Sequence, residues 1–251
     1  MLRILRPWVP APARVWLAVS RRAVNDWRSG NRRRFASRSE PRSAEAGSWP
    51  VRVTVTQALG KSAHLEAKRH NLARALRELQ GVSIEPEALF SFWHLVGEPS
   101  RGRGFVPGRN LVDGVLQLSD GGGICQLSGL TYLLGLQAGL HVVERHPHSA
   151  DIYTEATRFT PLGSDATVAY GYKDLRFLNV LPFPVALRFT LGEDTLVGEV
   201  CAPVALAPCA VDFTVEDGQS ERKVSTWLHR PGAPAPECLD VSHYRRPRDA
   251  A

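Results

Sequence analysis

Three consecutive glycines followed by a long uncharged stretch constrain this chain more than any other feature. Gly121, Gly122 and Gly123 interrupt an alternating segment, and residues 124–140 then contain no charged side chain. Glycine ends regular structure because it adopts backbone conformations that other residues avoid. The stretch after the glycines is mostly apolar and too long for one strand. It therefore predicts a long central helix that begins at Ile124 and ends at Gly139–Leu140.

Strand-like segments surround this helix and predict a mainly antiparallel sheet. The clearest is a hairpin over residues 185–200, with a Gly192–Asp194 turn between its two strands. A second helix is expected at residues 64–79, where leucine and alanine recur at helical spacing before Gly81. Further strands are expected at residues 51–55, 111–118, 142–146, 166–170 and 176–179. This order of elements favours an α+β domain, with the central helix packed on the sheet.

Charge divides the chain into two parts. Residues 1–45 hold eleven Arg, no Lys and three acidic residues, a net charge of +8, whereas the rest carries 20 basic and 22 acidic side chains. We therefore predict a basic N-terminal arm and linker at residues 1–50 and one α+β domain at residues 51–251, with its motif core at about 90–180. The weakly patterned tail beyond residue 200 predicts edge strands or loop. A nearly neutral domain argues against nucleic-acid binding.

The N-terminal arm carries no segment typical of export or of a membrane span. Its longest apolar run, Val15–Val19, is shorter than the roughly 7–15 residues of a signal-peptide core and the roughly 20 of a span. We therefore expect a cytoplasmic protein. Trp16 and Trp27 beside Arg21 and Arg28 fit a basic amphipathic helix, which predicts peripheral contact with an anionic membrane. The alternative is a helix packed on the domain, followed by a solvated arginine tail.

Cysteine spacing argues against a zinc site and against a disulfide framework. The four cysteines are Cys125, Cys201, Cys209 and Cys238, and none forms a C-x-x-C pair. We therefore expect free thiols, no metal and no cofactor. Cys125 differs from the others because it lies at the start of the central helix, where N–H groups and the helix dipole favour a thiolate. The competing interpretation is a small buried apolar residue.

Histidine and aspartate follow this cysteine in an order typical of thiol enzymes. His146 and His148 come about twenty residues later, on or after a strand, and Asp165 begins another strand. Such residues can supply a nucleophile, a base and a group that orients the base. Gln126 is a candidate oxyanion donor. The alternatives are a structural histidine, a metal site that matches zinc spacing poorly, and an Asp165 that bonds only its own backbone.

Five short motifs occur in order along the centre of the chain. They are Phe90–Phe92 with Val96–Gly97, Gly121–Ser128, Glu144–Ser149, Gly163–Val168 and Asp174–Asn179. Together they resemble the VanW-like (vancomycin-resistance accessory) family over about ninety residues, with weaker similarity from His70–Asn71 onward. The resemblance implies a bacterial protein linked to glycopeptide resistance and the cell wall, and it implies no defined reaction.

A remoter similarity concerns the order of elements. A cysteine on a helix, then a histidine on a strand and an aspartate on the next strand, is similar to transglutaminase-like and papain-like thiol enzymes. In that pattern His148 is the base and Asp165 is its partner. The separation between Cys125 and His148 is short for such an enzyme, because it leaves room for little more than one helix and one strand.

The residues and the resemblance predict two alternative functions. In the first, a thiol-dependent hydrolase or transferase acts on an amide bond of a cell-wall-type peptide, with Cys125 as nucleophile. In the second, a non-catalytic accessory or binding module holds a peptidoglycan precursor or a partner protein in the same cleft. Arg145 is a candidate substrate-binding residue because a guanidinium can hold a carboxylate through two hydrogen bonds, although an ion pair within the protein is the competing role. The other candidates for substrate binding are Gly122, Gly123 and Ser128.

Overall fold

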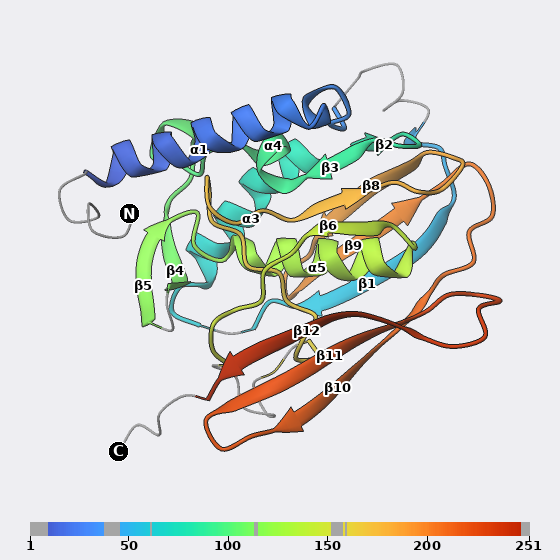
Figure 1. Ribbon diagram of the computed structural model, residues 1–251. Helices are drawn as coiled ribbons and strands as arrows, with labels where there is room; N and C mark the ends of the chain where they lie inside the picture. The colour runs from blue at the N-terminus through green and yellow to red at the C-terminus, as the bar shows by residue number, and fades with distance from the viewer. Residues whose placement is uncertain are drawn as a thin grey trace.

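Antiparallel sheets surround one buried helix, α5 (Ile124–Gln137), in the computed structural model (Figure 1). The structure describes residues 10–37, 46–60, 62–112, 115–151, 158 and 160–246. Within these residues every pair of named strands is antiparallel. The fold class is therefore α+β with mostly antiparallel sheets, as the sequence predicts.

The strands of the described residues form four sheets. The largest has the order β1–β9–β8–β2, made of β1 (Val51–Ala58), β9 (Thr195–Cys201), β8 (Val185–Leu191) and β2 (Ser83–Ile84). The second joins β3 (Leu89–Ser91), β7 (Arg176–Leu178) and β6 (His141–Glu144), and the third is the pair β4 (Pro107–Val112) and β5 (Val115–Asp120). The fourth contains β10 (Ala210–Asp217), β11 (Glu221–His229) and β12 (Glu237–Arg245). The other helices are α1 (Ala11–Arg28), α3 (Leu65–Leu79), α4 (Phe92–Val96) and the 3₁₀ turns η1 (Asn31–Arg33) and η2 (Arg101–Arg103).

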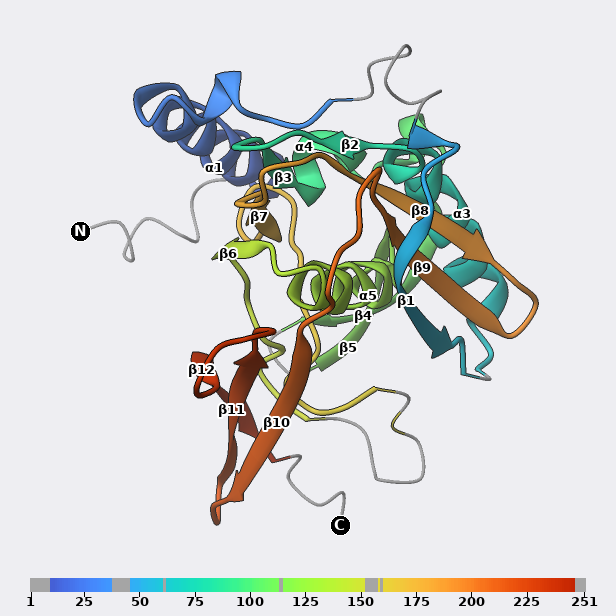
Figure 2. The same ribbon diagram turned by 90° about the vertical axis from the view of Figure 1, so that its right-hand side faces the viewer.

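α5 is buried along nearly its whole length because sheets pack on more than one side of it (Figure 2). Two glycines allow the close approach. A Cβ on Gly198 of β9 would lie 2.6 Å from Leu134, and a Cβ on Gly135 of α5 would lie 2.5 Å from the Phe177 ring of β7. The helix is thus held between the largest sheet and the β3–β7–β6 sheet, which fixes the position of its first turn.

Several predicted elements are confirmed with small shifts at their ends. α3 begins at Leu65 and ends at Leu79, and the β8–β9 hairpin turns at Gly192–Asp194 as expected. α5 ends earlier than predicted, at Gln137, because Gly139 adopts a positive φ of 76°. At 14 residues α5 is also shorter than α1 and α3, which have 18 and 15.

Two sequence-based predictions of strands are wrong, and a third is confirmed in part. Residues 166–170 form irregular chain with one isolated bridge between Ala169 and Lys173, not a strand. Residues 111–118 belong to two strands of a β4–β5 hairpin rather than to one. The tail after residue 200 is predicted as edge strands or loop, and it forms the β10–β11–β12 sheet, in which β10 and β12 are edge strands and β11 is the central one.

Within the N-terminal arm, α1 and Phe35 pack on the domain. Arg22 of α1 pairs with Glu144 of β6 at 2.5 Å, and Asp26 accepts two hydrogen bonds from Arg176 of β7 at 2.6 and 2.9 Å. Phe35 then forms an isolated parallel bridge with Leu89. Residues 38–45 of the predicted linker lie outside the described residues. The domain boundary at residue 50 stays a prediction, since the contacts of α1 and Phe35 cross it.

Candidate active site

Cys125 occupies the first turn of α5, directly after the glycine run. Gly121 and Gly123 have positive φ values of 79° and 93°, which turn the chain from β5 into the helix. A Cβ on Gly122 would lie 2.0 Å from the carbonyl carbon of Gly108 in β4, so the backbones touch there. Packing of the chain on itself therefore accounts for Gly122, and its predicted contact with a substrate stays untested. A Cβ on Gly123 would likewise meet the Lys68 side chain of α3 at 2.6 Å.

His148 and Asp165 form a short, doubly bonded pair beside this turn. The Nδ1 atom of His148 lies 2.5 Å from Oδ2 of Asp165, and the backbone N–H of His148 donates to the same oxygen at 2.7 Å. Their side chains are 23% and 18% exposed, so the pair is largely shielded from water. Because Nδ1 is engaged with Asp165, Nε2 is the ring nitrogen left to face the thiol.

The pKa of the Cys125 thiol is shifted by this pair. Cys125 is half-buried, and its Sγ lies 3.9 Å from the carbonyl oxygen of Val168. Burial disfavours the thiolate, but the hydrogen bond and the charge of His148 outweigh burial and lower the pKa of Cys125 below its usual value. The structure therefore brings the predicted Cys125, His148 and Asp165 together.

The pKa values of His148 and Asp165 are also shifted in favour of their charged forms. We refer to Cys125, His148 and Asp165 together as the candidate row. Burial opposes the imidazolium, yet hydrogen bonds to Asp165 and Cys125 raise the pKa of His148 to about 10. Burial also opposes the carboxylate of Asp165, but the hydrogen bond from His148 and the charge of Arg145 hold its pKa well below the usual range. All three shifts act in favour of the thiolate, imidazolium and carboxylate forms, the direction expected of an activated cysteine.

Arg145 lies behind Asp165 and is enclosed by the protein. Its side chain is only 3% exposed. Nε of Arg145 donates to the backbone carbonyl of Asp165 at 2.8 Å. One terminal nitrogen donates to the carbonyl of Gly163 at 2.8 Å and to Asp165 Oδ1 at 3.1 Å. The other terminal nitrogen donates to Asp240 at 2.8 Å. The guanidinium also lies over the ring of Tyr132, 5.1 Å from its centroid. These contacts favour the ion pair within the protein over the clamp on a substrate carboxylate, the two roles that the sequence leaves open.

Strand β12 adds a residue to the site that the sequence does not predict. The hydroxyl of Tyr244 donates to Asp165 Oδ1 at 2.5 Å and accepts from Arg145 at 3.1 Å. Asp165 thus receives donors on both oxygens, His148 on one and Tyr244 with Arg145 on the other. Tyr244 is 79 residues from Asp165 in the chain, and it lies in the tail whose weak pattern predicts only edge strands or loop.

His146, the other candidate base, belongs to a different cluster. Its Nε2 lies 3.0 Å from Oε1 of Glu144, which also pairs with Arg22 and accepts the N–H of Asp174 at 2.9 Å. The sequence placed His146 and His148 on one face of a strand, but β6 ends at Glu144 and the chain beyond it is irregular. The two imidazoles therefore bond to different carboxylates, and His148 is the one beside Cys125.

The side chains of Gln126 and Ser128 donate hydrogen bonds to backbone carbonyls within the protein. The Gln126 amide nitrogen donates to the carbonyl of Ala58 in β1 at 2.8 Å, because it projects from α5 about 100° away from Cys125. Ser128 is fully buried, and its hydroxyl donates to the carbonyls of Ala166 and Cys125. These bonds tie α5 to β1 and to the segment that carries Asp165. The predicted roles of Gln126 in catalysis and of Ser128 in substrate binding stay untested.

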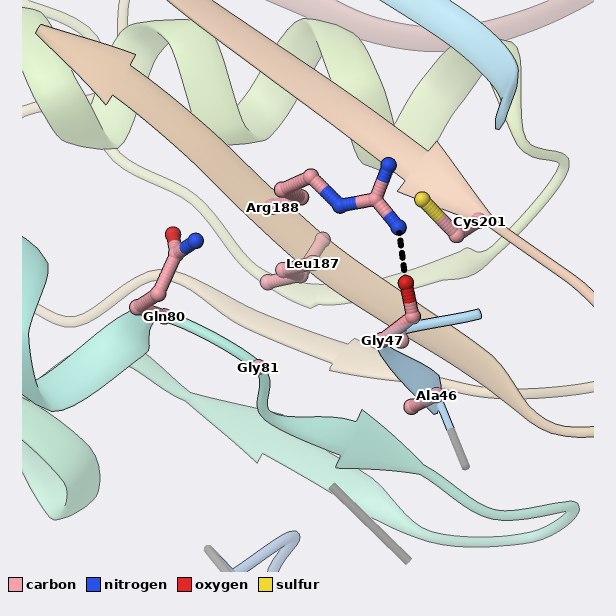
Figure 3. A pocket seen from close by; sticks show the side chains of 8 residues that line it. Ala46, Gly47, Gln80, Gly81, Leu187, Arg188 and Cys201 are labelled. Carbon is pink, nitrogen blue, oxygen red and sulfur yellow. Dashed lines mark hydrogen bonds between the residues drawn. The ribbon is translucent and has the colours of Figure 1, made fainter. Parts of the chain in front are cut away.

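A cavity of about 220 Å³ lies elsewhere, on the largest sheet (Figure 3). Its polar lining is already engaged. Arg188 donates to the carbonyl of Gly47 at 3.0 Å, and the side-chain oxygen of Gln80 accepts from the N–H of Phe189 at 2.8 Å. Cys201 also lines it and is fully buried, with its pKa raised by burial. None of the candidate site residues lines this cavity.

Comparisons with known proteins show which family the central part of the chain is similar to. A family model described as "VanW like protein" matches residues 67–201, which include Cys125, His148 and Asp165 but not Tyr244. No solved structure matches the chain, so the remoter similarity to transglutaminase-like and papain-like enzymes finds no support.

Two curated relatives agree with the family match. The chain is 31% identical over 137 residues to the vancomycin B-type resistance protein VanW of Enterococcus faecalis, covering 55% of this chain and 50% of that protein. It is 32% identical over 123 residues to the uncharacterized protein YoaR of Bacillus subtilis, covering 49% of this chain and 39% of that protein. The chain thus spans half or less of the length of these relatives. Because the family model covers more than half of the chain, the chain belongs to the VanW-like family.

Proposed function

We propose that this protein is a thiol-dependent enzyme that cleaves or transfers an acyl group at an amide bond. Cys125 is the nucleophile, His148 the general base and acid, and Asp165 the group that orients His148. The observation that carries the proposal is the hydrogen-bonded pair of His148 and Asp165, together with a Cys125 thiol whose pKa is lowered by His148. Nucleophile, base and orienting carboxylate in contact form the recurrent arrangement of acyl-transfer enzymes.

The proposed reaction has two halves. The Cys125 thiolate attacks the carbonyl carbon of the amide, and the carbonyl oxygen becomes an oxyanion. His148 then gives its Nε2 proton to the amine, which leaves as the C–N bond breaks and a thioester forms on Sγ. In the second half His148 takes a proton from water or from an acceptor amine, which attacks the thioester and releases the thiolate.

The start of α5 offers the donor that we assign to the oxyanion. The N–H groups of Ile124 and Gln126 bond to the carbonyls of Gly121 and Gly123 at 3.3 and 3.2 Å. The N–H of Cys125 itself lies between them, at the positive end of the helix dipole, and is the donor proposed here. The side chain of Gln126 is a weaker candidate because it bonds to Ala58.

The substrate class that we propose is a cell-wall peptide precursor. One relative is named for vancomycin resistance, and glycopeptide resistance concerns the peptides of the bacterial cell wall. Since the chain spans half of that relative, the assignment rests on the matched region, which contains the three site residues.

The chain offers an internal control for testing the nucleophile. Cys238 is exposed, whereas Cys201 and Cys209 are buried. We expect iodoacetamide at mildly acidic pH to alkylate Cys125 on the order of tenfold faster than Cys238, as measured by peptide mass spectrometry. Equal rates at the two cysteines would remove the activated nucleophile from the proposal.

Turnover distinguishes the enzyme from a binding module. We expect the protein to convert a muramyl pentapeptide precursor to a product of changed mass, and Cys125→Ser to abolish conversion while Cys238→Ser retains it. Capture of the peptide without conversion, at equal affinity in Cys125→Ser, would support the non-catalytic alternative.

A further inference from the structure

The outward face of α1 carries the helix's largest apolar side chains. Trp16 and Trp27 are each 68% exposed, and Leu17 and Val24 are 54% and 45% exposed. At 100° per residue, Trp16 and Trp27 lie on one line along the helix, and Leu17 and Val24 lie on a neighbouring line. A helix on a globular domain normally buries such residues against the core. An exposed apolar face of this kind therefore indicates an interaction surface.

The inward face of α1 is instead held by charged residues. Arg22 pairs with Glu144, and Asp26 pairs with Arg176, with Asp26 only 12% exposed at its side chain. A Cβ on Gly171 would lie 3.1 Å from Val19, so the aliphatic part of this face is packed as well. These contacts fix the rotation of the helix, and the tryptophans are therefore held outward.

Three exposed arginines border the apolar residues. Arg14, Arg21 and Arg28 recur every seven residues, which places them in one stripe along α1 beside Leu17 and Val24. Asp26 is the one acidic residue in α1, and it points inward. The outward face, defined by Trp16, Leu17, Val24 and Trp27 with these arginines, is therefore both apolar and purely cationic.

We propose that the outward face of α1 binds the surface of an anionic lipid bilayer, with the helix lying flat in the interface. Indole rings prefer this zone because one part of the ring is apolar and the N–H remains wet. Arginines at its edge attract anionic headgroups, with a long aliphatic stem alongside the acyl region. Across the parts of the chain that the structure describes, no helix has the length and apolar character needed to cross a membrane.

A second copy of this chain fits the face less well than lipid does. Pairing two outward faces would bring two stripes of Arg14, Arg21 and Arg28 together, with no acidic residue of α1 on either face to offset them. An anionic bilayer surface complements both parts of the outward face. Its headgroups offer negative charge to the arginines, and its acyl region offers an apolar layer to the tryptophans, Leu17 and Val24.

Vesicle sedimentation of the full chain tests this proposal. We expect binding to vesicles of phosphatidylcholine mixed with phosphatidylglycerol, little binding to phosphatidylcholine alone, and weaker binding as salt rises. Replacing Arg14, Arg21 and Arg28 together with Gln is expected to reduce binding on the order of tenfold or more. Trp16→Ser with Trp27→Ser is expected to reduce binding at every salt concentration and to remove the vesicle-induced blue shift of tryptophan fluorescence.

A matched variant separates the face from overall charge. Replacing Arg77 of α3, Arg101 of η2 and Arg109 of β4 with Gln removes the same three charges from exposed sites on other elements. This triple variant should keep most of the binding. An equal loss in both triple variants, or no binding to the anionic vesicles, would overturn the proposal.

Two further measurements distinguish loss of lipid binding from loss of the fold and from self-association. Far-UV circular dichroism should be unchanged in every variant, because the contacts of Arg22 and Asp26 remain. Sedimentation velocity should show the same species with and without Trp16 and Trp27. Self-association that depends on these two tryptophans would assign the face to a second copy and overturn the lipid assignment.

Discussion

One carboxylate oxygen, Oδ2 of Asp165, accepts two hydrogen bonds from His148. The bond from Nδ1 measures 2.5 Å and the bond from the backbone nitrogen measures 2.7 Å. Two bonds to the same oxygen fix the orientation of the imidazole and leave Nε2 for the thiol. They also explain why a histidine in irregular chain can have a defined position, since the carboxylate supplies the constraint that a strand would otherwise give.

Asp165→Asn should therefore weaken the site without removing the histidine. We expect the pKa of His148 to fall from about 10 toward its usual value of 6.5, because the largest favourable interaction of the imidazolium is lost. Alkylation of Cys125 at mildly acidic pH should slow by about tenfold or more, since the thiolate loses the charge of its partner. Proton NMR titration of His148 and alkylation kinetics measure the two effects.

An exposed histidine–aspartate pair provides the control for that variant. Asp212 lies 2.9 Å from His229 on β10 and β11, with both side chains well exposed. Asp212→Asn should leave the alkylation rate of Cys125 unchanged. Equal slowing in the two variants would contradict the role assigned to Asp165.

Arg145→Met is expected to destabilise the protein through the carboxylates it leaves behind. The buried guanidinium pairs with Asp165, whose side chain is 18% exposed, so its removal leaves that carboxylate without its guanidinium partner in a shielded region, whereas its second partner Asp240 is 43% exposed. Breaking such a buried pair costs about 3–5 kcal/mol, which urea unfolding followed by tryptophan fluorescence can measure. Arg101→Met is the matched control, because Arg101 is 76% exposed and its pair with Asp120 should contribute less than about 1 kcal/mol. A similar loss in both variants would contradict this account.

The sequence predicted the three members of the candidate row because each had a local signal. Glycines before an apolar segment placed Cys125 at a helix start, and His148 and Asp165 followed within short, motif-like segments. It could not choose between His146 and His148, because the choice depends on where β6 ends. The chain leaves the strand at Glu144, and the alternation of faces then no longer applies.

The remainder of the site depends on pairing across long distances in the chain. Tyr244 reaches Asp165 only because β12 pairs with β11, and the β10–β11–β12 sheet packs beside α5. The weak pattern of the tail predicts edge strands or loop but not which strands pair, because a weakly patterned strand leaves its register open. Gln126 follows Cys125 directly in the sequence, but the helical rotation directs its side-chain nitrogen to Ala58, and its role in catalysis stays a prediction.

Gly122→Ala tests whether the glycine run serves the chain itself. The new Cβ would lie 2.0 Å from the carbonyl carbon of Gly108, so β4 and the start of α5 must separate. We expect a loss of about 1–3 kcal/mol or more in the free energy of unfolding, together with slower alkylation of Cys125. Gly102→Ala is the control, because nothing lies within 4 Å of its added Cβ. A Gly122→Ala protein with wild-type stability would show that the close approach of β4 is not required.

The pairing of α1 with the domain should make stability depend on acid pH through Glu144. Burial raises its pKa, but hydrogen bonds from His146, Arg22 and the N–H of Asp174 prevail and lower it from 4.5 to about 2. A carboxylate with a depressed pKa stabilises the fold above the unfolded value of 4.5, and that stabilisation is lost as pH falls toward 2.

Glu144→Gln should therefore be less stable than the wild type at neutral pH by about 2–3 kcal/mol, with the difference shrinking as pH falls from 4.5 to 2. Urea unfolding across this pH range measures the difference. Glu216→Gln is the matched control, since Glu216 pairs with Lys223 at 3.1 Å on the exposed part of β10 and β11, and it should follow the wild-type curve. A wild-type protein whose stability advantage over Glu144→Gln persists unchanged at pH 2 would contradict this linkage, because a protonated Glu144 no longer forms the ion pair with Arg22.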